Sequence, residues 1–214
     1  MIVADATFWG RGYGVLVLRC PHSKKNLHWQ EICTETVEVY HQARMALEQQ
    51  GCLIQAVVLD GKPGIRQVFA DVPIQQCHFH QMALVTRYLT RQPKLLAGQE
   101  LRRITLSLPH TTQELFAQQL QHWQQTWAAF LKERTLNLET HRWYYTHRRL
   151  RSAYRSLTAN LPYLFSYQAH PQLQIPNTTN GLDGTFSHLK RLLSAHHGLK
   201  RERRLKLIHE ILNH

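Results

Sequence analysis

The sequence predicts an α/β protein with a mixed five-stranded sheet, flanking helices and an all-helical insertion. Short β-prone runs separated by turn residues fill the first third of the chain, and helical spacing fills the middle third. Two amphipathic helical segments follow at the end of the chain. Two of the apolar runs carry a carboxylate, Asp5 and Asp60, which is costly to bury unless its charge is compensated.

The first three expected strands cover residues 2–9, 13–19 and 27–33. Short turn segments connect them, and such connections favour an antiparallel meander. Side chains alternate between the two faces of a strand, so Asp5 shares its face with Val3, Thr7 and Trp9. A helix is expected at 36–50, and Gly51 would end it.

The next segments predict parallel crossovers. Residues 53–59 form a continuous apolar run, as expected of a buried strand, and Asp60 ends it. A short helix is expected at 64–70 and a short strand at 73–76. Taken alone, Asp60 would be interpreted as a turn or cap residue.

From about 79 to 165 the pattern is helical, and Trp123, Trp127 and Phe130 are spaced for one helix face. Residues 141–151 mix aromatic and cationic side chains and contain no acid. This stretch could follow a nucleic-acid backbone and stack on a base. It could equally be an amphipathic helix with Trp143, Tyr144 and Leu150 in the core.

The end of the chain predicts a loop at 166–177, a helix at about 178–195 and a basic helix at 199–212. The first helix has a Thr/Asn cap candidate and an apolar stripe of Leu182, Phe186, Leu189 and Leu193. Asp183 lies in its first turn, where the helix dipole alone could explain an acid.

The composition favours a polyanionic partner. The formal net charge is +12, which makes nucleic acid the default candidate. No apolar run reaches the roughly 18 residues needed to span a bilayer, and the N-terminus lacks the basic leader of a signal peptide. The four cysteines include no C-x-x-C pair, which fits reduced thiols in a cytosolic protein.

The order of three strands, helix, strand, helix, strand and helix is that of the ribonuclease-H-like fold. In that fold the first and fourth strands are neighbours, so Asp5 would lie beside Asp60, and a helix would supply a third acid. The expected organisation is a catalytic core of 1–80 and 177–214 with a mostly helical insertion at 81–176.

Four motifs in sequence resemble the signatures of DDE/D transposases. They are Asp5-Ala6-Thr7, Val58-Leu59-Asp60-Gly61, Cys77-His78-Phe79-His80 and Thr178-Thr179-Asn180-Gly181-Leu182-Asp183. The closest likeness is to the Mutator-like branch and related bacterial insertion-sequence transposases. The resemblance implies metal-dependent cleavage and transfer of DNA strands at the ends of a mobile element.

The resemblance also implies the site. Asp5, Asp60 and Asp183 would ligate two Mg²⁺ or Mn²⁺ ions, and Cys77 and His80 would form a motif near the active site. The partner would be double-stranded DNA bound by a homo-oligomer in a bacterial or archaeal cytoplasm, associated with the nucleoid and with no membrane. The residues expected to contact the DNA backbone are Lys62, Arg142, Arg148, Arg149, Arg151, Lys190, Arg191, Lys200 and Arg201.

Two departures from the family pattern bear on the prediction. Asp183 stands where relatives have Glu, so Glu202 and Glu210 are alternative third acids. The family's N-terminal DNA-binding region is missing, which suggests a truncated gene, a fragment or an isolated catalytic domain. The alternatives are a decayed, non-catalytic DNA-binding protein and a nuclease that cuts without joining. A structural zinc site at Cys77 and His80 is less favoured because no second pair of ligands is evident.

Overall fold

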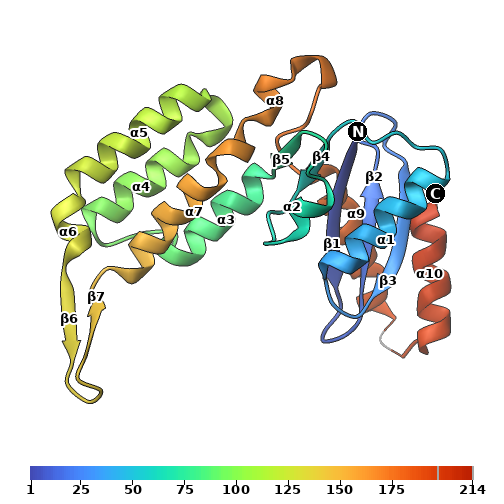
Figure 1. Ribbon diagram of the computed structural model, residues 1–214. Coiled ribbons are helices and arrows are strands. Elements are labelled where there is room, and N and C mark those ends of the chain that lie inside the picture. The colour runs from blue at the N-terminus through green and yellow to red at the C-terminus, as the bar shows by residue number, and fades with distance from the viewer. Residues whose placement is uncertain (197, 214) are drawn as a thin grey trace.

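The computed structural model describes residues 1–196 and 198–213, and its main feature is a five-stranded sheet (Figure 1). The strands are β1 (Ile2–Phe8), β2 (Gly14–Arg19), β3 (Asn26–Ile32), β4 (Val57–Leu59) and β5 (Ile74–Gln76). Their order is β3-β2-β1-β4-β5. The first three are antiparallel, while β4 runs parallel to β1 and β5 parallel to β4. The expectation of an α/β protein with a mixed five-stranded sheet is confirmed.

The fourth strand is shorter than the predicted run of 53–59. Leu53 is 82% exposed, and ladder pairing begins only at Val57. Just before the strand, the carbonyl oxygen of Ala56 accepts a hydrogen bond from the backbone N–H of Ile2 at 3.0 Å. The apolar run identified the strand, but the strand begins only at Val57, where β1 and β5 pair with it on either side.

One face of the sheet is covered by α1 (Val37–Gln49) and the short α2 (Ile65–Val68). Thr36 caps α1, because its side chain accepts a hydrogen bond from the Val39 N–H at 3.3 Å. The side chains buried on this face include Ile2, Ala4, Leu16, Leu18, Tyr40, Leu47, Leu59 and Phe69.

The other face is covered by α9 (Asn180–Ala195) and α10 (Arg201–Asn213). The predicted apolar stripe of α9 is buried here, together with Val3, Val15, Val17, Val58 and Ile208. Strand alternation places Asp5 on the same face as Val3, and hence toward α9. This packing brings the C-terminal part of the chain to the strands that carry the first two acids.

Between β5 and α9 the chain forms a mostly helical part with its own core. Its helices are α3 (His78–Leu89), α4 (Leu96–Leu106), α5 (Gln113–Thr126), α6 (Ala128–Lys132), α7 (Arg148–Leu164) and α8 (Ser166–Ala169). Short 3₁₀ helices lie at Leu108–His110 and Pro171–Leu173, the latter with α8 inside the segment expected to be a loop. Trp123 is buried, and Trp127 and Phe130 pack against the same core. At the junction with the sheet, Gln75 Nε2 donates to the carbonyl oxygen of Leu164 at 2.9 Å.

The prediction of an all-helical insertion is wrong at one place, the hairpin of β6 (Arg134–Asn137) and β7 (Arg142–Tyr145). Trp143 lies in β7 and is 63% exposed, so the interpretation of 141–151 as one helix with this residue in its core is also wrong. Cross-strand contacts explain the hairpin, because Arg134 pairs with Tyr145 and lies over its ring at 4.9 Å. None of these residues joins the main sheet.

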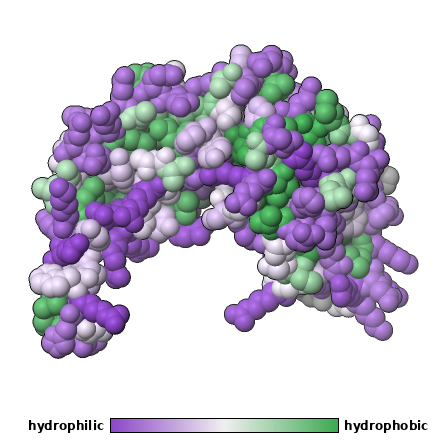
Figure 2. All heavy atoms as spheres, in the orientation of Figure 1, coloured by the Kyte–Doolittle hydropathy of each residue, from purple (hydrophilic) through white to green (hydrophobic). Residues whose placement is uncertain are grey.

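The molecule is arched (Figure 2). The helical part and its hairpin form one arm, the sheet with α1, α9 and α10 forms the other, and the space between them is open (Figure 1). Hydrophilic residues cover much of the visible face (Figure 2). No helix within the described ranges is long and apolar enough to cross a membrane.

Candidate active site

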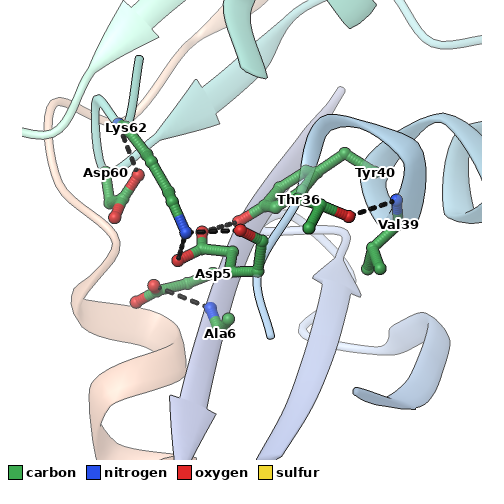
Figure 3. A network of polar contacts seen from close by, with 8 residues as sticks. Asp5, Ala6, Thr36, Val39, Tyr40, Asp60 and Lys62 are labelled. Carbon is green, nitrogen blue, oxygen red and sulfur yellow. Dashed lines mark hydrogen bonds and ion pairs between the residues drawn. The ribbon is translucent and has the colours of Figure 1, made fainter. Parts of the chain in front are cut away.

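The sheet topology makes Asp5 and Asp60 neighbours. Val3 pairs with Val58 in the parallel ladder of β1 and β4, so two residues further along, Asp5 lies beside Asp60. Figure 3 shows both residues beside β1, and Asp60 Oδ1 accepts a hydrogen bond from the backbone N–H of Lys62 at 2.9 Å. The expected adjacency of the first and fourth strands is present, while a cation shared by the two acids stays a prediction.

Asp5 is buried in a setting that disfavours its charge. The residue is 5% exposed, and burial, together with the charges of Asp60 and Asp183, raises its pKa from 3.8 to about 7. Two groups act in the opposite direction, the nearby His80 and the backbone N–H of Ala6, which donates to Asp5 Oδ1 at 2.8 Å. The groups of the protein therefore compensate the negative charge of Asp5 only in part.

Asp183 reaches the site from α9. It lies in the first turn of that helix and is partly exposed, and it contributes to the raised pKa of Asp5. Leu182 and Phe186, on either side of it in sequence, are buried against the sheet and fix the helix there. Glu202 lies on α10, in its exposed first turn, and is not among the groups whose charge acts on Asp5.

Cys77 connects β5 to the start of α9. Its sulfur accepts a hydrogen bond from the backbone N–H of Thr179 at 3.4 Å and lies 3.4 Å from that residue's hydroxyl oxygen. Both residues are fully buried, and the N–H of His78 donates to the carbonyl oxygen of Asn177 at 2.8 Å. These contacts hold the segment that leads into the helix carrying Asp183.

His80 lies beside the acids, in surroundings that favour its charged form. Interaction with the Cys77 side chain, followed by the charges of Asp5 and Asp60, raises its pKa from 6.5 to about 9 against the opposing effect of burial. Its Nδ1 atom is buried and has no hydrogen-bond partner among the described residues. The predicted Cys77–His80 motif thus lies at the acids, where it supplies a positive charge and an anchor for α9.

Sequence reasoning missed a fourth acid, Glu35. Its carboxylate accepts a hydrogen bond from the Tyr40 hydroxyl at 2.7 Å and lies 3.2 Å from the Lys62 ammonium nitrogen. The local signal was weak, because Glu35 precedes the cap of α1 and is far in sequence from Asp60. Lys62, expected to contact DNA, is instead engaged at the edge of the acidic site, and its contact with DNA stays a prediction.

The other predicted DNA contacts fall into two groups. Three arginines make fixed contacts within the protein: Arg149 donates to the carbonyl oxygen of Arg87 at 2.8 Å, Arg151 to that of Leu131 at 2.7 Å, and Arg201 to the carboxylate of Glu31 at 2.6 Å. The remaining five residues are exposed: Arg142, Arg148, Lys190, Arg191 and Lys200. Of these, Arg148 lies over the Tyr144 ring at 4.7 Å and Arg191 is 3.1 Å from His188 Nδ1. Arg142 and Arg148 lie on the hairpin and the start of α7, far in sequence from Lys190 and Lys200.

The donor set suits a hard divalent cation, since Asp5, Asp60 and Asp183 offer only carboxylate oxygens. Burial and the neighbouring acids raise the pKa of Asp5, and a bound cation would lower it again by compensating the negative charge. Within residues 1–196 and 198–213, however, no three His, Cys, Asp or Glu side chains are already grouped closely enough to hold a metal ion. Binding would therefore require the carboxylates to move closer together.

Comparison of the chain with protein-family models and with curated proteins gave no match. The likeness to DDE/D transposases therefore rests on the four motifs, whose residues Asp5, Asp60, Cys77, His80 and Asp183 interact in the folded chain.

Proposed function

We propose that the chain is the catalytic domain of a DDE/D transposase of the Mutator-like branch, built on a ribonuclease-H-like fold. What supports the proposal is that Asp5, Asp60 and Asp183, from β1, the end of β4 and α9, are near enough for the charges of the last two to raise the pKa of Asp5. The strand order, with an antiparallel meander followed by two parallel strands, supports the fold.

In this proposal the three acids hold two Mg²⁺ or Mn²⁺ ions. Such ions, when bound, lower the pKa of the attacking water or hydroxyl group and stabilise charge at phosphorus. The backbone N–H of Lys62 orients Asp60, and that of Ala6 orients Asp5. His80 offsets part of the negative charge, and Cys77 holds Thr179, just before the helix whose first turn carries Asp183.

Double-stranded DNA is the proposed partner, bound by a homo-oligomer. The net charge of +12 supplies the electrostatic attraction to phosphates. Arg142 and Arg148, at the start of β7 and of α7, and Lys190 and Lys200, on α9 and just before α10, are exposed and would contact the backbone of the bound DNA. A location in the cytoplasm of a bacterium or archaeon, at the nucleoid, belongs to the same proposal.

The test is incubation of the protein with supercoiled plasmid and a labelled duplex oligonucleotide in Mn²⁺. A transposase nicks the plasmid and joins the labelled strand to it, and Asp5→Asn, Asp60→Asn or Asp183→Asn abolishes both products. Asp71→Asn is the matched control, because Asp71 pairs with Arg44 on the surface away from the site. Cleavage without joining would identify a nuclease, and DNA binding without cleavage would identify a non-catalytic binding protein.

A further inference from the structure

Strand β5 carries two glutamines where a buried strand ordinarily has apolar side chains. Gln75 is fully buried and Gln76 is 2% exposed. A buried amide is unfavourable unless its donor and acceptor groups are hydrogen-bonded, so two buried amides predict two sets of polar partners. Side chains alternate along a strand, and the two glutamines reach different parts of the molecule. Gln75 bonds to Leu164 in the helical part, whereas Gln76 bonds to the residue that follows β4.

Gln76 holds the backbone of the turn that carries Asp60. Its Nε2 atom donates to the carbonyl oxygen of Asp60 at 2.8 Å. Gly61 makes this approach possible, because its φ of +93° is in the left-handed region and a Cβ atom there would overlap the amide group of Gln76. In the same turn, Asp60 Oδ1 accepts a hydrogen bond from the backbone N–H of Lys62 at 2.9 Å. The position of the Asp60 carboxylate therefore depends on a turn that Gln76 fixes.

Arg66 connects Gln76 to the helical part. Its Nη2 atom donates to Gln76 Oε1 at 2.6 Å and to Asn160 Oδ1 at 2.6 Å. The guanidinium group also lies over the Tyr163 ring at 4.1 Å. Asn160 and Tyr163 both belong to α7, whereas Arg66 belongs to α2, the short helix after the turn. One guanidinium group thus joins α7 to the residue that holds the Asp60 turn.

Asn160 is itself held in place at both ends of its amide. Its Nδ2 atom donates to Gln81 Oε1 at 2.6 Å, and Gln81 is fully buried on α3. The charge of Asp60 reaches into this network, because burial lowers the pKa of Arg66 while the nearby Tyr163 and Asp60 act in the opposite direction. A continuous set of hydrogen bonds therefore runs from α3 and α7 to the acid at the end of β4.

We propose that Gln76, Arg66 and Asn160 are positioning residues for Asp60, and that through them the helical part holds this acid where it can bind a divalent cation. The inference rests on the proposed function only in taking Asp60 as a cation ligand. Hydrogen-bonded partners of a ligand affect a metal site because they limit where the ligand can lie. A purely structural role predicts a different result, since loss of a buried hydrogen bond would then lower stability and leave the acidic site unchanged.

The experiment compares Asn160→Ala with the control Thr158→Ala. Both positions lie on α7, but the Thr158 hydroxyl bonds to backbone carbonyl oxygens of its own helix. The first measurement, on metal-free protein, is hydrogen exchange of the Lys62 amide, which reports on the Asp60 turn. We expect this amide to exchange about three- to tenfold faster in Asn160→Ala, as for the loss of one hydrogen bond, and at the wild-type rate in Thr158→Ala.

The second measurement is the dissociation constant of Mn²⁺ by calorimetry. Gln76→Met, which keeps the length of the side chain and removes both hydrogen bonds, should raise the constant about tenfold or more. Asn160→Ala should raise it about three- to tenfold. Combining the two changes should add little to the effect of Gln76→Met, because the effect of Asn160 on Asp60 passes through Gln76.

Lys62 exchange and Mn²⁺ affinity that stay unchanged in Asn160→Ala, or change equally in Thr158→Ala, would overturn the inference. Additive effects of Gln76→Met and Asn160→Ala on Mn²⁺ affinity would overturn the route through Gln76. Failure of the proposed function is separate, because it appears as wild-type protein that binds Mn²⁺ and DNA without cleaving the DNA. Wild-type cleavage together with undiminished Mn²⁺ affinity in the variants would overturn this inference alone.

Discussion

Replacing Asp5 by Asn should stabilise the metal-free protein at neutral and alkaline pH. The folded-state pKa of about 7 exceeds the ordinary 3.8, so the folded protein binds the proton more tightly than the unfolded chain does. No penalty exists below pH 3.8; stability is lost as the pH rises from there to about 7 and stays reduced above it. At about 1.36 kcal/mol per pKa unit, a shift of about three units corresponds to at most about 4 kcal/mol.

The Asn side chain preserves the local structure, because its carbonyl oxygen can still accept the hydrogen bond of 2.8 Å from the Ala6 N–H. Loss of the attraction between Asp5 and His80 would reduce the gain. For a chain of this size, about 4 kcal/mol corresponds to roughly 8–16 °C in melting temperature as an upper bound.

The assay is thermal and denaturant unfolding in chelator at pH 4 and pH 8. We expect the variant and the wild type to differ little at pH 4 and most at pH 8. Asp71→Asn is the control with the opposite sign, because its hydrogen bond to Arg44 lowers the pKa of Asp71 to about 2. Asp71→Asn should lose only a little stability at pH 8, because the ion pair with Arg44 that it removes is exposed to solvent.

Addition of Mn²⁺ completes the experiment. At 100 times the dissociation constant, a bound ion should stabilise the wild type by about 2.7 kcal/mol, and Asp5→Asn should lose most of this effect. A variant that is less stable than the wild type at every pH, or a difference that does not change with pH, would refute the electrostatic reasoning. Equal stabilisation of both proteins by Mn²⁺ would place the ion elsewhere.

Three further outcomes are expected. Asp183→Asn should abolish Mn²⁺-dependent cleavage with duplex affinity retained, whereas Glu202→Gln should cleave normally; the reverse result would assign the third acid to α10. Charge reversal of Arg142 and Arg148 should weaken binding to any duplex sequence and flatten its salt dependence by about one unit per lost phosphate contact, which anisotropy at several salt concentrations measures. Cys77→Ala should increase hydrogen exchange at the start of α9, because it removes the sulfur contacts to that segment; unchanged exchange there would mean that packing alone holds the helix.

Local patterns in the sequence determined the elements of the sheet and its flanking helices. Alternation in β1 placed Val3 and Asp5 on one face, and the apolar stripe of α9 is buried as its spacing predicts. These properties follow from side-chain periodicity over a few residues. The same reasoning failed at β6 and β7, whose four-residue strands are too short for a period and are stabilised by cross-strand pairs such as Arg134 with Tyr145.

The tertiary structure alone decided which distant residues meet. The ladder of β1 with β4 sets Asp5 beside Asp60, and the packing of α9 adds Asp183. The raised pKa of Asp5 results from these encounters and from burial, so no local pattern predicts it. The same holds for the pairing of Glu35 with Lys62 at 3.2 Å. Such contacts depend on long-range packing. When apolar side chains of distant segments are buried against each other, polar groups of those segments are brought together.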